Sequence, residues 1–293
     1  MPEWFLSPSC LLLALLCIPT LQAAEPSHEP SGKELIQQAS RHQDQFPYIF
    51  EKQTMILTDA HGNQDVRQAR RYSRVESDGS VRFLLLFDTP VDVRGAALLG
   101  RHNQLKQFNT SIYLPALGHL IDINTANSQS SLILGTDFSM DNLLPERQED
   151  FIYHRLSDRR IGESDFYVVD AIPGTQPPKQ ESGFSHRQHL IRPDNMFIVQ
   201  TDFFDRRGQI YKRISHHDLH QMNGTVWHSN MILIENFRDN HKTLIKTQRR
   251  VLSNDYVPPE MFTEQWLLQN SQDGRGTITE LSDQEENSTT IEP

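Results

Sequence analysis

The residues with the greatest capacity for chemistry are in the segment HHDLH, which holds His216, His217, Asp218 and His220. In an extended strand alternate side chains share a face, so His216, Asp218 and His220 would lie together and His217 would point to the other side. Two imidazoles and a carboxylate can hold a metal ion. The polar outer face of a hairpin explains the group at least as well, because metal sites usually also recruit a ligand from elsewhere in the chain. His216 and His220 are therefore weak metal candidates.

No enzymatic motif accompanies these histidines. The sequence contains no G-x-S-x-G elbow, no H-E-x-x-H pair, no P-loop and no G-x-G-x-x-G segment. His186 and His189 are three residues apart, which in a strand places them on opposite faces. We therefore predict no catalytic residue, no cofactor and no enzymatic activity.

Two loop segments carry charged residues that could either fix the backbone or contact a ligand. Asp92 and Arg94 could form an ion pair that fixes a turn, or Arg94 could hold a lid or an anionic head group through its fork of donors. Asp137 or Ser139 could cap a helix that begins near Ser139. Asp137 could instead contact a lid or head group, and Phe138 could belong to the lid. Both interpretations stay open for each segment.

The charge balance excludes nucleic acid as a partner. The chain has 293 residues, with 28 Lys and Arg against 38 Asp and Glu, and its net charge is −10. Phosphate binding requires clustered basic residues. The basic spots that do occur could contact an anionic membrane surface or a transporter, although exposed strand charges are common; they are Arg70, Arg71, Arg74, Arg159 and Arg160.

The first residues predict export. The only two cysteines, Cys10 and Cys17, lie in the apolar run CLLLALLCI. This run is too short for a membrane span, which needs about 20 residues. It has the length of a secretory signal core, and the small residues Ala23 and Ala24 follow at a suitable cleavage point. We predict that residues 1–24 are a signal peptide and that the mature protein is soluble, periplasmic and free of thiols.

The remaining chain has the pattern of a mainly β protein. One amphipathic helix is expected over Lys33–Gln45 and a short one over Pro258–Leu268, with a strand rhythm between them. Asn223-Gly224 is typical of a tight hairpin turn. About eleven strands predict one domain over 25–268, built on a single curved antiparallel sheet with few helices. The acidic segment 269–293 is expected to be disordered.

A curled sheet has an inner face that must be filled by side chains, a helix or a ligand. Phe83, Leu85 and Phe87 share a face by the two-residue period, and so do Trp227, Met231 and Leu233. Periodicity does not distinguish a filled core from a cavity. The candidate ligand cavity consists of nine apolar residues, namely Phe83, Leu85, Phe87, Leu98, Tyr113, Phe138, Trp227, Met231 and Leu233.

Three segments in order resemble a known family. They are FDTPVDVRGAALL at Phe87–Leu99, IYLPALGHLIDI at Ile112–Ile123 and ILGTDFSMDNLL at Ile133–Leu144. Together they look like the exported outer-membrane lipoprotein-sorting-like proteins, which are related in fold to LolA/LolB-type periplasmic carriers. The resemblance implies a half-open β-barrel covered by short helices, a cavity that holds acyl chains, and an association with RND/MMPL-type inner-membrane transporters.

On this resemblance we expect a monomeric periplasmic carrier that binds a lipid or lipidated cargo and shuttles it between membranes. Asp92, Arg94 and Asp137 are its candidate lid or head-group contacts. A lipid-responsive sensor on the same fold is the first alternative. A metal-dependent periplasmic enzyme built around His216 and His220 is the second.

Overall fold

The computed structural model describes Met1 and residues 29–43, 46–102, 108–123, 134–138, 148–174, 184–223 and 226–271. Two compact units divide the chain, Met1–Pro30 and Ser31–Pro293. Every described helix and strand belongs to the second unit. In the part of the chain that the structure describes, no helix combines the length and the apolar character that crossing a bilayer requires.

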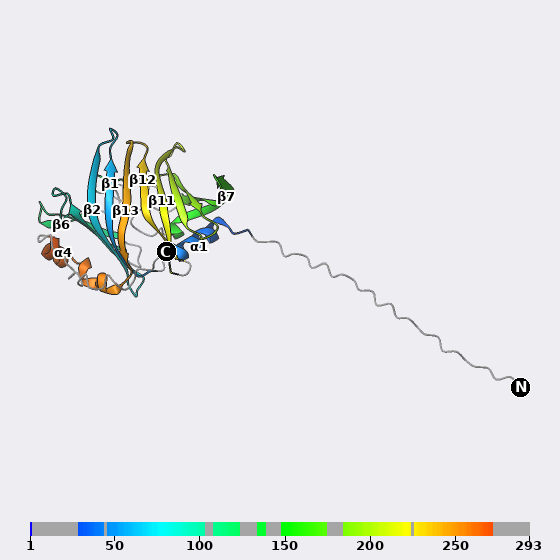
Figure 1. Cartoon of the computed structure of the whole chain (residues 1–293), viewed down its shortest axis with the longest axis horizontal. Coiled ribbons are helices and arrows are strands. Elements are labelled where there is room, and N and C mark those ends of the chain that lie inside the picture. Colours follow the sequence, from blue (N-terminus) through cyan, green and yellow to red (C-terminus); the bar gives the residue numbers. More distant parts are fainter. Residues whose placement is uncertain are drawn as a thin grey trace, which may run out of the picture. The chain divides into compact units, whose positions relative to one another are not determined.

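Thirteen strands form one antiparallel sheet that is strongly curved and not closed (Figure 1). In chain order they are β1 (Tyr48–Thr58), β2 (Gln64–Val75), β3 (Val81–Thr89), β4 (Ala97–His102), β5 (Phe108–Leu114), β6 (His119–Ile123), β7 (Phe151–Ile161), β8 (Ser164–Pro173), β9 (His186–Ile191), β10 (Ile198–Phe204), β11 (Ile210–Asn223), β12 (Val226–Asn236) and β13 (His241–Val251). The predicted mainly β class with one curved antiparallel sheet is confirmed, with more strands than the eleven or so expected.

The order across the sheet is β6-β5-β4-β3-β2-β1-β13-β12-β11-β10-β9-β8-β7. Each pairing joins strands that are neighbours in sequence, except that β1 pairs with β13 in the middle of the sheet. The edges are β6 and β7. Predictions on residues 2–28, on Ser139, on Gly224 and on residues 272–293 lie outside the described residues. Residues 269–271, which were expected to begin the disordered tail, are helical.

The two faces of the sheet carry separate apolar clusters. We define the inner face as the one with Phe83, Leu85 and Phe87, which pack together as predicted. Leu84 and Leu86 alternate with them and belong to a second cluster on the outer face. Both sets are nearly inaccessible to solvent, so β3 is buried on both sides.

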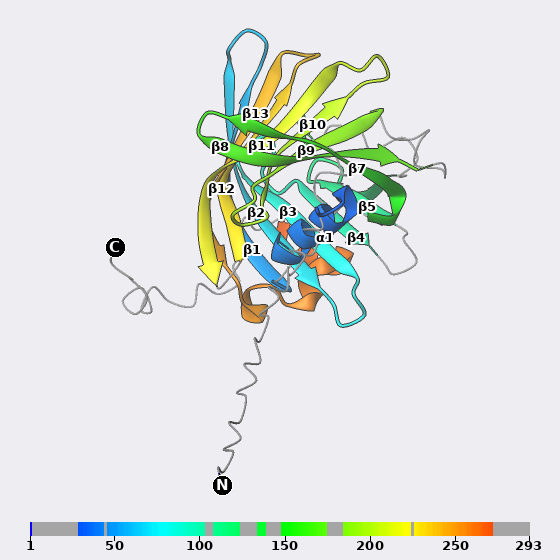
Figure 2. The same cartoon turned by 90° about the vertical axis from the view of Figure 1, so that its right-hand side faces the viewer.

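Helix α1 (Gly32–Gln43) covers part of the inner face (Figure 2). It begins with a capping box, in which Ser31 Oγ accepts from the Glu34 N–H at 3.3 Å and Glu34 Oε2 accepts from the Ser31 N–H at 2.7 Å. Its buried residues, Leu35 among them, pack on Val169 of β8 and Ile191 of β9. The expected N-terminal helix therefore exists and begins one residue earlier than predicted, and the last two residues of the predicted range, 44 and 45, lie outside the described residues.

The C-terminal segment covers the outer face with two short helices instead of the one expected. The 3-10 helix η4 (Pro259–Phe262) is followed by α4 (Glu264–Ser271). Thr263 between them is extended, and its Oγ1 accepts a hydrogen bond from the Trp266 N–H at 3.2 Å. Thr263 thus acts as an N-cap, which starts a new helix and interrupts the predicted one.

Candidate ligand-binding pocket

A pocket of about 360 Å³ lies on the inner face. Its apolar wall comes mainly from β1 and β13, which pair in the middle of the sheet, and from the strands that flank them. The apolar residues that line it are Met55, Leu85, Phe138, Phe197, Ile198, Phe203, Ile214, Trp227, Ile232 and Ile245. The volume is near the lower end of the roughly 300–1,000 Å³ typical of small-molecule sites.

The same pocket also has polar lining residues, among them three arginines, one carboxylate and three histidines. We call the part of the lining around Glu51, with Arg71, His228 and Arg250, the polar wall. The polar residues that line the pocket are Glu51, Gln53, Arg71, Arg187, His189, Thr201, His216, His228, Ser229, Thr247 and Arg250. Because the histidines described below are neutral at pH 7, the charged lining is dominated by arginine. The pocket is therefore amphipathic rather than uniformly apolar.

Strand register separates the two walls along the sheet. Met55 on β1 lies opposite Ile245 on β13, which lies opposite Ile232 on β12. This row of apolar residues crosses three strands. Four residues earlier on β1, and therefore on the same face, Glu51 lies opposite Arg71 on β2 and Arg250 on β13. At about 3.4 Å per residue the two rows are roughly 13 Å apart.

Glu51 is the centre of an ion-pair cluster at the polar wall. Its Oε1 accepts from Arg250 Nε at 2.7 Å, and its Oε2 accepts from Arg71 Nη1 at 3.1 Å and from Gln53 Nε2 at 2.8 Å. Burial by itself would raise the pKa of Glu51. The guanidinium groups of Arg71 and Arg250 outweigh this effect and hold the pKa below its usual value. Glu51 is therefore ionised and keeps both arginines in place.

The two arginines differ in how many of their donors are used. Arg250 also donates from Nη1 to Asn230 Oδ1 and from Nη2 to the Ser229 carbonyl, both at 2.9 Å, and its side chain is 7% exposed. Among the described residues, Arg71 donates only the one hydrogen bond to Glu51, and its side chain is 26% exposed. A guanidinium carries five N–H groups. Arg71 thus keeps donors that a ligand in the pocket can use.

Two histidines at this pocket are held in the neutral form. Burial, together with the neighbouring His217, lowers the pKa of His216 to about 4. Burial also lowers the pKa of His228 to about 4, with a further contribution from Arg250 that Glu51 partly opposes. The rings of Phe197 and Phe46 contact His216 and His228, respectively.

Each of these imidazoles has a ring nitrogen that is buried and has no hydrogen-bond partner among the described residues. The atoms are Nδ1 of His216 and Nε2 of His228. A buried polar atom without a partner costs about 1–3 kcal/mol. A polar group of a ligand in the pocket could satisfy either nitrogen, since a neutral imidazole can donate or accept.

Arg187 is held by aromatic rings on the β9 side of the pocket. Its guanidinium carbon lies 4.4 Å from the ring centre of Phe184, 4.9 Å from that of Phe151 and 5.2 Å from that of Phe203. Such contacts favour a cation over the face of a ring. Arg187 therefore adds positive charge to the pocket at a fixed position.

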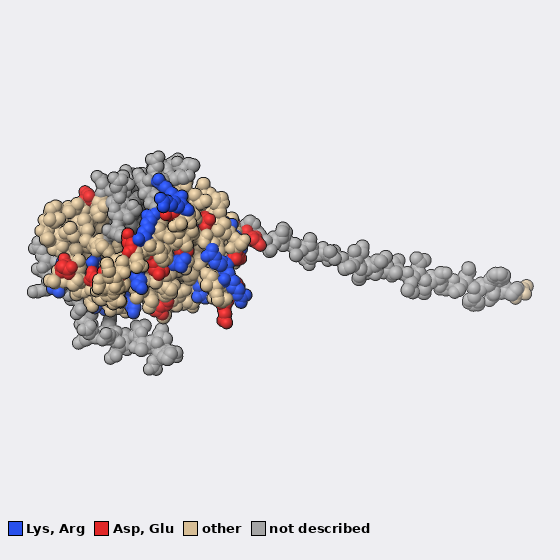
Figure 3. Space-filling view, turned by 90° about the horizontal axis from the view of Figure 1, so that it is seen from above, with Lys and Arg blue, Asp and Glu red and all other residues tan. Residues whose placement is uncertain are grey.

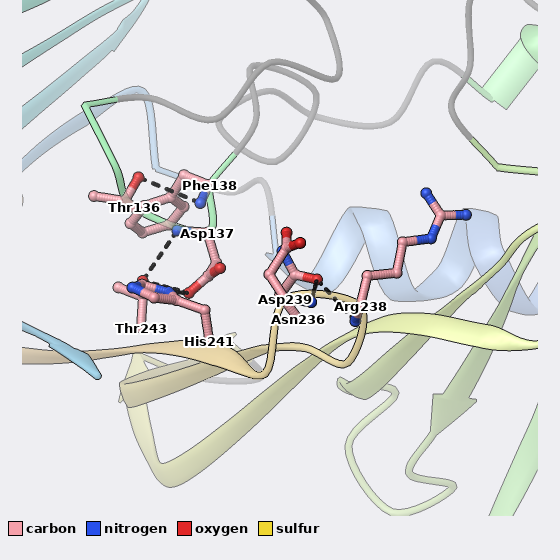
Figure 4. Close-up of polar contacts among 8 residues, drawn as sticks. All are labelled: Thr136, Asp137, Phe138, Asn236, Arg238, Asp239, His241 and Thr243. Atoms are coloured by element: carbon pink, nitrogen blue, oxygen red, sulfur yellow. Dashed lines mark hydrogen bonds and ion pairs between the residues drawn. The ribbon is translucent and has the colours of Figure 1, made fainter. Parts of the chain in front are cut away.

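The described segment 134–138 is anchored on β13 and brings Phe138 to the pocket (Figure 4). Thr243 Oγ1 accepts from the Asp137 N–H at 3.0 Å and donates to Asp137 Oδ2 at 2.8 Å. His241 Nδ1 lies 2.7 Å from the same carboxylate oxygen. Asp137 is buried and serves as the anchor, and it is not among the residues that line the pocket.

The other two candidate lid or head-group residues are in the turn after β3. Asp92 and Arg94 are both exposed. Arg94 Nε donates to the carbonyl of Asp88 at 3.2 Å, and no ion pair joins Arg94 to Asp92 among the described residues. The alternative of a buried Asp92–Arg94 pair is therefore wrong, because both side chains point to solvent at a tight turn.

The nine candidate cavity residues separate into three groups. Leu85, Phe138 and Trp227 line the pocket. Phe83, Phe87 and Leu98 lie on the same face but pack into its core, with less than 3% exposure each.

The third group lies outside both the pocket and the inner core. Tyr113 packs in the outer-face cluster beneath the C-terminal helices. Met231 and Leu233 alternate with Ile232 and Ile234, which belong to the inner face. The register of β5 and β12 against their neighbouring strands decides which face these side chains occupy. Alternation within a single strand does not specify that register.

The two metal candidates are not brought together. His216 lines the pocket, whereas His220 is exposed and pairs with Asp218 at 3.0 Å. Asp218 between them has a positive φ of 53°, but the pairing of β11 with β12 keeps its register from His216, opposite Ile232, to His220, opposite His228. Within the described ranges, no group of three or more His, Cys, Asp or Glu residues is arranged to hold a metal ion.

Charged residues of both signs are interspersed over the face shown in Figure 3. The arginine-rich wall of the pocket is therefore a local feature and not the continuation of a basic surface on that face. Sequence reasoning had identified Arg71 only as a surface charge and had not identified Glu51, His228 or Arg250. No local signal marked them, because β2 and β13 are rich in polar residues on both faces.

Comparison with known proteins supports the architecture. An outer membrane lipoprotein-sorting protein domain, so named, from Vibrio parahaemolyticus is 21% identical with a TM-score of 0.73, and the match covers 81% of this chain and 98% of that one. A DUF1329 family protein from Desulfovibrio piger is 20% identical with a TM-score of 0.70, covering 79% and 98%. A LolA superfamily protein from Nitrosomonas europaea is 12% identical with a TM-score of 0.62, covering 81% and 100%.

No curated protein matches the chain in sequence. A family model described as "Uncharacterized protein" matches residues 79–269, which is more than half of the chain and includes most of the sheet. The chain therefore belongs to this family, and its fold is that of the LolA-like superfamily.

Proposed function

We propose that this protein is a carrier that binds the acyl part of a lipid or of a lipidated cargo in the inner-face pocket. The observation that supports the proposal best is the pocket itself, a partly apolar space of about 360 Å³ on the inner face of an open LolA-like sheet. The Vibrio parahaemolyticus domain, which has a similar fold, is named for outer membrane lipoprotein sorting.

The energetics suit a carrier. Each buried methylene contributes about 0.8 kcal/mol, so a chain of sixteen carbons offers roughly 12 kcal/mol before losses. Ordering and association costs remove a large part of this. The remaining affinity shields a lipid from water and still allows release to an acceptor. No chemical step is required of the protein.

The proposal includes a place and a partner. Residues 1–24 act as a signal peptide that exports the chain to the periplasm, where an RND/MMPL-type inner-membrane transporter delivers the cargo. N-terminal sequencing of the protein recovered from the periplasm tests the first part. An unprocessed N-terminus on protein that stays in the cytoplasm would contradict it.

Native mass spectrometry of gently purified protein tests binding, and transfer to acceptor vesicles tests carriage. We expect co-purifying acyl species and transfer between donor and acceptor vesicles. Protein that binds the lipid without transferring it would instead be a sensor. Protein that carries stoichiometric zinc and no lipid would support the metal-dependent enzyme.

A matched pair of variants links binding to the pocket. Ile232 and Leu233 are consecutive, both half-buried, and on opposite faces of β12. Ile232→Trp fills the pocket and should reduce acyl binding at least tenfold, whereas Leu233→Trp should leave it within about twofold. Equal effects of the two substitutions would place the binding site elsewhere.

A further inference from the structure

We infer that the pocket selects an acyl chain with an anionic head group, and that Arg71, assisted by His228, holds that head group. This inference rests on the proposed function and narrows the ligand to an anionic amphiphile. A carboxylate and a phosphate head group would both fit, because each presents anionic oxygen atoms that accept hydrogen bonds.

The charge of the lining favours an anion. Three arginines line the pocket against one glutamate, while the whole chain has a net charge of −10. The pocket thus has positive charge inside an acidic protein. A low-dielectric concave site of one sign concentrates ligands of the other sign. A neutral lipid would gain nothing from this arrangement.

Arg71 is prepared to bind such a group. Its single described hydrogen bond, to Glu51 at 3.1 Å, fixes its orientation while most of its N–H donors remain available. Arg250, in contrast, uses all three of its nitrogens within the protein. A planar guanidinium matches the oxygens of a carboxylate or phosphate in bidentate fashion. Glu51 therefore positions Arg71, and Arg71 contacts the ligand.

His228 supplies a second contact. It lies close enough to Arg71, Arg250 and Glu51 for all three to influence its titration, and its Nε2 has no partner among the described residues. An imidazole that is neutral at pH 7 can donate one hydrogen bond to an anion without adding charge. The free nitrogen of His228 and the free donors of Arg71 thus lie at the same polar wall.

The apolar row accounts for the acyl chain. Met55, Ile245 and Ile232 run across three adjacent strands, which spans about 10 Å between the outer two. All three residues line the pocket. The pocket therefore offers an apolar surface for an acyl chain on the same face as the donors of Arg71.

The test compares dodecanoate, dodecyl phosphate and dodecanol by calorimetric titration, below the micelle concentrations of the two anions and the solubility limit of the alcohol. We expect at least one of the two anions to bind roughly ten- to a hundredfold more tightly than dodecanol, which is the gain from charge-assisted hydrogen bonds. The anion that binds more tightly identifies the head group. Equal binding of both anions and dodecanol would overturn the inference and leave the carrier function standing.

Three variants locate the selectivity. Arg71→Met should bring the anion-to-alcohol affinity ratio close to one. Glu51→Gln should raise that ratio, because it removes the opposing charge and keeps one oxygen that can accept from Arg71. Arg207→Met, at an exposed position in the turn before β11, is the control and should not change the ratio. An unchanged ratio in Arg71→Met, with dodecanol binding showing that the pocket is folded, would overturn the assignment of Arg71.

Acetate and inorganic phosphate separate a free anion from a head group. We expect neither to displace dodecanoate below millimolar concentration. If either anion displaces dodecanoate at the concentration at which dodecanoate itself binds, the site takes free anions. That result would overturn the inference that the ligand is an amphiphile. If dodecanol and both dodecyl anions fail to bind, the proposed function fails together with the inference.

Discussion

Lowering the pH should destabilise the folded protein before its carboxylates begin to titrate, because of His216. Its pKa is about 4 in the folded state and about 6.5 for a free imidazole. Between these values the unfolded chain binds a proton at this position and the folded protein does not. The free energy of unfolding therefore falls as the pH decreases through this window.

The magnitude follows from the two pKa values. Between pH 7.5 and pH 5, where the folded form stays neutral, the expected loss is about 2 kcal/mol at 1.36 kcal/mol per pKa unit. The Nδ1 atom of His216 is inaccessible to solvent although the residue as a whole is partly exposed, so solvent screening makes this value an upper estimate. His228 is only partly buried and should contribute less. Urea unfolding followed by circular dichroism at several pH values measures the combined contribution of the two histidines to the free energy of unfolding.

A non-titrating variant isolates the contribution of His216. His216→Gln should remove about 2 kcal/mol of the difference in stability between pH 7.5 and pH 5. His61→Gln, in an exposed turn, is the matched control and should leave the difference as in the wild type. If His216→Gln keeps the full pH dependence, the neutral buried imidazole is not its source and the reasoning fails.

Three further substitutions test the fold. Gly100→Ala should cost about 1–3 kcal/mol of folding stability, because an added Cβ would clash with the buried ring of Phe83. A thermal melt measures this loss, and an unchanged melting temperature would show that the ring can move. Thr243→Val should cost about 1–3 kcal/mol, because the backbone N–H of Asp137 loses its partner and the carboxylate keeps only His241. Hydrogen exchange at residues 134–138 should become faster, and unchanged exchange would contradict the anchor. Leu35→Ala should cost about 2–5 kcal/mol by leaving a cavity beneath α1, and stability within 1 kcal/mol of the wild type would show that α1 is dispensable.

The architecture was predictable because local patterns specify the strands. The run VRFLLLF predicted β3 at Val81, and the alternation of Phe83, Leu85 and Phe87 correctly placed them on one face. The C-terminal helix was less well predicted, because the break at Thr263 depends on one side chain that caps a new turn. The family resemblance implied the LolA-like fold, which the solved structures bear out.

The polar wall was not predictable from local patterns. Glu51 and Arg250 are 199 residues apart in sequence, and only the pairing of β1 with both β2 and β13 brings them and Arg71 together. For His216, the sequence favoured a polar strand face, with a metal site as the weaker alternative, whereas the residue lines the pocket and contacts Phe197. That contact depends on how another segment of the chain packs on β11, which the two-residue period of β11 does not specify.

The two strands that meet in the middle of the sheet are the first and the last to leave the ribosome. Strands β1–β6 and β7–β13 can each assemble as a meander of sequence neighbours, but the halves join only when His241–Val251 is available to pair with Tyr48–Thr58. Until then β1 has a bare edge, which is the kind of surface through which partly folded chains aggregate. A circular permutant that links the end of β13 to the start of β1 and opens the chain between β6 and β7 would turn the whole sheet into one continuous up-and-down meander.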